Sequence, residues 1–87
     1  MRRVRVAAVQ MDPRIGQLER NRRTIVDRSA QAFQAGASIV AFPECALSGY
    51  CFASREEARL HAVDPSGPFL EPIVDVCRRG GGRVVLG

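Results

Sequence analysis

The hydrophobic residues fall into three short runs and one longer periodic stretch, which together predict alternating strands and helices. Val4 to Met11 is apolar at most positions, as expected for a strand that is covered on both faces and is central in its sheet. Ile39 to Phe42 is a second run rich in β-branched residues, and Arg83 to Gly87 is a third. Strands of this kind separated by helical stretches predict an α/β fold.

The stretch from Leu18 to Ala35 has the period of a helix. Gly16 allows the turn into this helix, and Gly36 is a natural residue to end it. Arg22 projects onto the apolar side, where we expect its stem to lie on the core while its guanidinium reaches water. A right-handed crossover through the helix would make the flanking strands parallel. The remaining residues on the apolar side are Leu18, Ile25, Val26, Ser29, Ala30 and Phe33.

Two more helices are predicted between the second and third strands, which gives the order β-α-β-α-α-β. Ser54 to Glu57 matches a capping box and predicts a short helix to about Ala62. A proline at position 72 must lie in a first turn, so the last helix is expected over about residues 71–79, after an irregular turn. Gly80 to Gly82 should end it, because the triplet lacks the spacing of a phosphate loop and precedes a strand. The positions expected to be buried in this helix are Ile73, Val74 and Cys77.

The candidate chemistry of the chain is centred on Glu44, which follows the second predicted strand. Pro43 cannot donate a ladder hydrogen bond, so pairing should stop there and place Glu44 at the rim of the sheet. Open α/β folds collect ligands at this rim, and a partly desolvated carboxylate can accept a proton there. From spacing alone, a solvated surface glutamate is the commoner alternative. Tyr50, just beyond a Ser-Gly turn signal, is as compatible with packing as with contacting a substrate.

Composition narrows the classes of protein that the chain can belong to. Its 87 residues make one domain at most, and 46% hydrophobic with 25% charged residues argues against disorder along the whole length. No apolar run approaches the roughly 18 residues that span a bilayer, so we expect a cytoplasmic protein with no membrane partner. All thirteen basic residues are arginines, which give a net charge of +4. They are spread along the chain with few aromatic residues, so no nucleic-acid partner is expected.

The cysteines and the histidine do not form a recognisable metal or disulfide pattern. Cys45, Cys51 and Cys77 are odd in number, and their spacing fits neither a disulfide framework nor paired zinc ligands. Reduced thiols explain them. His61 has no metal-ligating residue suitably spaced from it. We therefore expect neither a metal nor a cofactor.

Several short segments are specific in their order and spacing, although each is weak alone. They are Val6 to Met11, Asn21, Ala35 to Glu44, Leu47 to Tyr50, Gly67-Pro68 and Gly82 to Gly87. In these segments the sequence resembles the N-terminal portion of a carbon–nitrogen hydrolase of the nitrilase superfamily. The resemblance covers about the opening third of a family domain, so residues 1–87 are expected to form a partial domain. It implies the N-terminal part of an α-β-β-α sandwich.

The resemblance also implies a site made of a glutamate, a lysine and a cysteine. The cysteine attacks a nitrile or amide carbon, the glutamate is the general base, and the lysine stabilises the tetrahedral intermediate. The glutamate falls on Glu44, and Tyr50 would line the pocket wall. The family's lysine and cysteine lie further downstream, and this chain contains no lysine. Cys45 adjoins Glu44, but neighbouring side chains in an extended segment diverge, and none of the three cysteines matches the nucleophile motif.

These features lead to one main hypothesis and one alternative. The chain is expected to be an enzyme segment that carries only the general base and is inactive alone. Once completed, it would act on a small amide or nitrile, and family members commonly pair, so a homo-oligomer is a further expectation. The alternative is a small noncatalytic α/β module that pairs with a partner through its uncovered last strand, at Val84 to Leu86.

Overall fold

The computed structural model of the chain describes residues 4–43, 46–47 and 67–86. The predicted strands, the first helix and the last helix are confirmed, although each strand is shorter than its apolar run. The helix predicted from Ser54 to Ala62 lies outside the described residues. In chain order the elements are β1 (Val6–Ala8), α1 (Leu18–Gln34), β2 (Ile39–Ala41), a 3-10 turn η1 (Pro68–Leu70), α3 (Glu71–Gly80) and β3 (Arg83–Val85).

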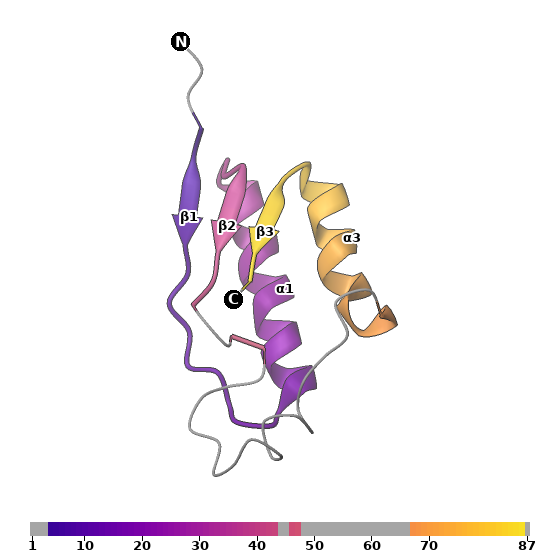
Figure 1. Ribbon diagram of the computed structural model, residues 1–87. Coiled ribbons are helices and arrows are strands. Elements are labelled where there is room, and N and C mark those ends of the chain that lie inside the picture. Colours follow the sequence, from indigo (N-terminus) through magenta and orange to yellow (C-terminus); the bar gives the residue numbers. More distant parts are fainter. Residues whose placement is uncertain (1–3, 44–45, 48–66, 87) are drawn as a thin grey trace.

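The strands form one parallel sheet in the order β1-β2-β3 (Figure 1). The prediction that the first strand is central is wrong for this sheet, because β2 holds that place. Val40 of β2 pairs in register with Ala7 on one side and Val84 on the other, and it is fully buried. By contrast, Val6 of β1 is 60% exposed. In the described part of the chain, β1 is therefore covered on one face only.

Both helices cover the same face of the sheet, as the arrangement in Figure 1 shows. The core between the layers joins Val40 of β2 to Ile25 of α1 and Ile73 of α3. Side chains alternate along a strand, so the residues next to Ala7, Val40 and Val84 face away from the helices. Val6 and Val85 are such residues, and each is more than half exposed. The described part thus consists of one helical layer on one parallel sheet, as expected for part of the predicted α/β fold.

The side of α1 that faces the core follows the predicted spacing. Its buried residues are Asn21, Ile25 and Ser29, which recur every four positions. Arg22 differs from the prediction, because its Nη1 donates to the Phe69 carbonyl oxygen at 3.0 Å instead of reaching water. Its guanidinium also lies 4.2 Å from the centroid of the Phe69 ring, a cation–π contact. Arg22 therefore ties α1 to η1.

The glycine triplet ends α3, as predicted, and it also provides space for a neighbouring helix. Gly81 has φ +66, a left-handed conformation that suits a helix C-terminus. Gly80 and Gly82 lie against Phe33 of α1, and a β-carbon at either position would overlap its ring. The absence of side chains at these two positions therefore lets α1 approach the link between α3 and β3.

The buried face of α3 differs in part from the prediction. Ile73 and Val76 are buried, whereas Val74 is 47% exposed and Cys77 is half-buried. Residues three apart share a helix face, so burial of Ile73 and Val76 turns Val74 outward. Neither α1 nor α3, the α-helices of the described part, is long and apolar enough to cross a membrane.

Candidate functional site

The carboxyl ends of β1 and β2 meet at one edge of the sheet. Beyond the regular strands, the Val9 amide donates to the Ala41 carbonyl oxygen at 2.9 Å, and the Phe42 amide donates to the Val85 carbonyl oxygen at 3.0 Å. These bonds carry the parallel pairing slightly further and bring the three strand exits close together. In open α/β sheets, ligands bind outside such exits.

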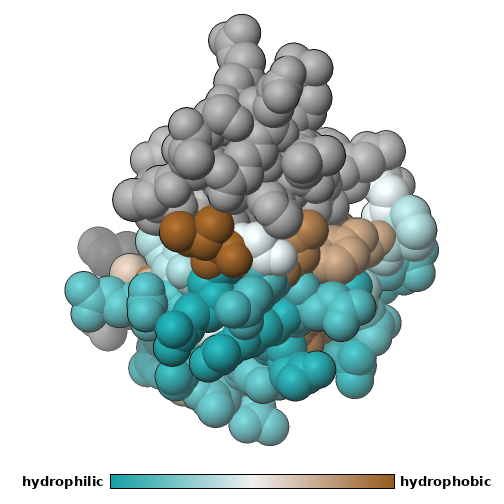
Figure 2. All heavy atoms as spheres, turned by 90° about the horizontal axis from the view of Figure 1, so that it is seen from below, coloured by the Kyte–Doolittle hydropathy of each residue, from teal (hydrophilic) through white to brown (hydrophobic). Residues whose placement is uncertain are grey.

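An open hollow of about 480 Å³ lies at the exits of β1 and β2. Apolar and polar groups both line it, so it offers an apolar wall and hydrogen-bonding groups to a small molecule. Its lining residues are Val9, Gln10, Met11, Asp12 and Pro43. Figure 2 looks at the molecule from the end toward which the strands run, and the described residues visible there are mostly hydrophilic, with a few hydrophobic groups among them.

Pro43 marks the point at which β2 leaves the sheet. Phe42, just before it, makes the last ladder bond and is 8% exposed, and Pro43 has no amide hydrogen to continue the ladder. The Pro43 carbonyl oxygen accepts from the Ala46 amide at 3.2 Å, and Ala46 is buried. This bond holds Ala46 close to Pro43. Glu44 and Tyr50, the predicted site residues, lie outside the described residues. In the sequence, however, Glu44 directly follows Pro43, which lines the hollow.

Asn21 is a buried polar residue near this edge that the residue pattern did not single out. It is 1% exposed. Its Oδ1 accepts from the Arg14 amide at 2.8 Å, and its Nδ2 donates to the carbonyl oxygens of Arg14 at 2.8 Å and Leu47 at 2.7 Å. It thereby joins the loop after β1 to the turn after β2. Its position four residues before Ile25, on the side of α1 that faces the core, could have indicated from the sequence that Asn21 is buried.

Cys77 lies at the opposite end of the sheet from the hollow. Its carbonyl oxygen accepts from the Gly82 amide, just before β3 begins, whereas the hollow lies where strands end. Burial raises the pKa of the Cys77 thiol, an effect partly offset by a hydrogen bond to the Val84 backbone. A raised pKa lowers the thiolate fraction that a nucleophile needs. Cys45 and Cys51 lie outside the described residues.

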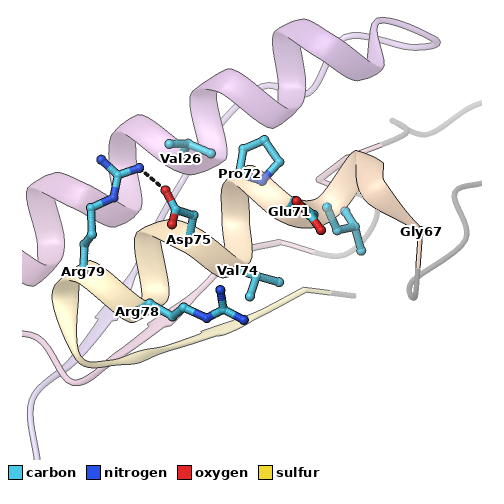
Figure 3. Close-up of a pocket in the computed structure, with 9 residues that line it drawn as sticks. Val26, Gly67, Glu71, Pro72, Val74, Asp75, Arg78 and Arg79 are labelled. Atoms are coloured by element: carbon cyan, nitrogen blue, oxygen red, sulfur yellow. Dashed lines mark hydrogen bonds and ion pairs between the residues drawn. The ribbon is translucent and has the colours of Figure 1, made fainter.

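A second hollow, of about 510 Å³, lies between α1 and the start of α3 (Figure 3). Val26 comes from α1, while the remaining lining residues belong to the segment from Gly67 to Arg79. The Asp75 carboxylate on its wall is paired with Arg79 one turn later, and both side chains are more than half exposed. The hollow at the strand exits is the stronger candidate site, because open α/β sheets bind ligands where their strands end.

No group of three or more histidine, cysteine, aspartate or glutamate residues in the described ranges is placed to hold a metal ion. The chemistry available at the strand exits is that of carboxylates, amides and backbone groups. Such groups can orient a polar substrate or transfer a proton.

Comparison with known proteins assigns the chain to a family. Residues 5–87 match the family model described as carbon–nitrogen hydrolase. A nitrilase from Pyrococcus abyssi is 34% identical over 85 residues, which cover 97% of this chain and 32% of that protein. The chain thus spans about a third of the length of this relative. Because the family match extends from the residue before β1 to beyond β3, the chain belongs to the carbon–nitrogen hydrolase family.

Proposed function

We propose that this chain is the N-terminal part of a hydrolase that cleaves non-peptide carbon–nitrogen bonds, with Glu44 as its general base. The observation that supports this most strongly is the position of Pro43. It lies at the exit of the central strand and lines the hollow, and Glu44 is the next residue. Family membership supplies the reaction class. Residues 1–87 would then be a partial domain of that enzyme.

The proposed chemistry needs groups that this chain does not supply. Glu44 would accept the proton of a cysteine thiol as it attacks an amide or nitrile carbon, and later the proton of the water that releases the acyl group. A lysine would stabilise the tetrahedral intermediate, but the chain contains none. We therefore expect the 87-residue chain to be inactive alone, with no metal or cofactor needed after completion. Tyr50 would form part of the pocket wall.

The proposed enzyme is an amidase or nitrilase acting on a small molecule in the cytoplasm, with a homo-oligomer as its expected state. Neither nucleic acid nor membrane would be a partner. The hollow suits this class of substrate, because Met11 and Val9 offer apolar contact while Gln10 and Asp12 offer hydrogen bonds.

A chimera tests this proposal. Residues 1–87 are joined to the remainder of the Pyrococcus abyssi nitrilase, which would supply the lysine and cysteine. Ammonia release from small aliphatic amides and nitriles is measured for the chimera and for the 87-residue chain at equal concentration. Activity in the chimera and none in the chain would support the proposal. Turnover by the purified 87-residue chain, or a folded chimera with no activity, would contradict it.

The noncatalytic alternative is favoured by one observation, the exposed edge of the described sheet. In that part of the chain β3 has a neighbour on one side only, and Val85 is 54% exposed. Such edges can pair with another chain. Size-exclusion chromatography with light scattering tests this alternative, since a module of this kind would form a dimer or larger complex. A monomer that unfolds cooperatively would argue against it.

A further inference from the structure

Asn21 uses its amide group to hold two separate loops at the strand exits. It lies in the first turns of α1, four residues before Ile25, and is almost completely buried. Its side-chain oxygen and nitrogen pair with the amide and carbonyl groups of Arg14, as a neighbouring strand would. The second hydrogen on Nδ2 goes to the Leu47 carbonyl oxygen at 2.7 Å. Both donor hydrogens are thus engaged by loops outside the helix.

The two loops that Asn21 joins are those that border the hollow. Arg14 lies in the link from β1 to α1, two residues after Asp12 of the lining. Leu47 lies just after the turn in which the Ala46 amide donates to the Pro43 carbonyl oxygen. In the sequence, Glu44 lies between Pro43, which follows β2, and Leu47, whose carbonyl oxygen accepts a hydrogen bond from Asn21.

We propose that Asn21 is a positioning residue for the general base, because it fixes the turn after β2 against the loop after β1. This inference rests on the proposed function of Glu44. The side chain of Asn21 need not touch a substrate, since its hydrogen bonds hold the backbone at Leu47, three residues after the base, and at Arg14 in the loop after β1. Catalysis is sensitive to such support, because a displacement of about 1 Å can lower the rate on the order of 100-fold.

The chemistry of the contact explains why an amide is needed at this position. Two of its three bonds are donated by Nδ2 to carbonyl oxygens. Aspartate has nearly the same shape but, when ionised, only accepts hydrogen bonds. Asn21→Asp would therefore set a carboxylate oxygen against the carbonyl oxygens of Arg14 and Leu47. The variant keeps the volume of the side chain while removing both donated bonds.

A matched control is available one turn later in α1. Ile25 is fully buried and packs in the core, but its side chain makes no hydrogen bond. Ile25→Val removes one methylene from the core that Ile25 shares with Ala46, and so perturbs stability while the three hydrogen bonds of Asn21 stay in place. Asn21→Ser is a milder second variant, since its hydroxyl can still donate one hydrogen bond.

The first measurement uses the 87-residue chain labelled with 15N and 13C. We expect Asn21→Asp to shift the amide resonances of Arg14 and Leu47 and the carboxyl resonance of Glu44. Ile25→Val should leave all three near their original values. If Asn21→Asp and Asn21→Ser both leave the Glu44 resonance unchanged, the inference is wrong. This result does not depend on whether the chain belongs to an active enzyme.

The second measurement uses the chimera under conditions where each variant is folded. We expect Asn21→Asp to lower kcat on the order of 100-fold while KM changes far less, since substrate contacts are retained. Asn21→Ser should fall between it and the parent, and Ile25→Val should remain near the parent. If all three variants lose activity only in proportion to their unfolded fraction, the inference is wrong. An inactive parent chimera would count against the proposed function alone, and the resonance shifts would then decide the role of Asn21.

Discussion

Replacing Gly80 by alanine tests whether the end of α3 packs directly on Phe33 of α1. Gly80 is the last residue of α3, and helix propensity alone favours alanine over glycine by about 1 kcal/mol. A β-carbon at Gly80 would overlap the ring of Phe33 and lie 2.8 Å from its Cβ atom. That Cβ atom is fixed to the backbone of α1, so a change of rotamer cannot move it away.

The size of the effect follows from these two opposing contributions. Overpacking in a core costs about 1–3 kcal/mol, and the immovable Cβ atom places this contact in the upper part of that range. After subtraction of the propensity gain, we expect Gly80→Ala to lower the free energy of unfolding by about 1–2 kcal/mol. Urea titration followed by far-ultraviolet circular dichroism measures this change, provided that the m-value stays constant.

Gly81→Ala is the matched control, because its β-carbon would meet nothing within 4 Å. It should lower stability only through the cost of its left-handed φ, about 1–2 kcal/mol. In a Phe33→Ala background, the effect of Gly80→Ala should shrink, because the ring is gone and only the contact with the Cβ atom remains, whereas the effect of Gly81→Ala should not change. A stabilising Gly80→Ala, or an effect independent of residue 33, would refute this packing.

Three further predictions concern single side chains. The buried Ser29 hydroxyl has no hydrogen-bond partner among the described residues, so Ser29→Ala should raise the unfolding free energy by about 1 kcal/mol, and a clear loss in urea titration would contradict this. Arg22→Lys should lower it by about 1 kcal/mol, because lysine cannot stack on Phe69 as a planar guanidinium does, and equal urea midpoints would argue against this contact. Burial raises the pKa of the Cys77 thiol, so the folded state binds its proton more tightly than the unfolded state. The thiol therefore stabilises the folded state below the ordinary thiol pKa of 9.0, and this stabilisation is lost as pH rises through the raised value. In Cys77→Ala, the urea midpoint should fall less over that pH range.

The sequence was informative wherever local periodicity decides the structure. The spacing of Ile25 and Ser29 located the buried side of α1, and the fixed φ of proline together with the glycine triplet located both ends of α3. The end of β2 at Pro43 followed from a missing amide hydrogen. Each of these features depends on residues close together in the chain.

Features set by distant contacts were not predictable in the same way. Strand order depends on pairing between residues far apart, so the apolar composition of β1 did not show that β2 is central. Arg22 departs from its expected exposure because Phe69, far along the chain, provides both a carbonyl oxygen and a ring. Asn21 appeared only as part of a family resemblance, since a polar residue on an amphipathic helix is usually assigned to solvent. Its hydrogen-bond partners lie in two loops, and the spacing of hydrophobic residues does not show that these loops come together.

The most direct test of the central claim compares Glu44→Gln with Asp12→Asn in the chimera. Each change replaces a carboxylate by its amide, and we propose that Glu44 alone transfers the proton. We expect Glu44→Gln to lower kcat by a factor of about 10²–10⁴, the usual contribution of a general base, while Asp12→Asn, which alters a residue that lines the hollow, should change KM more than kcat. Equal activity in Glu44→Gln and the parent, or equal losses in the two variants, would contradict the claim.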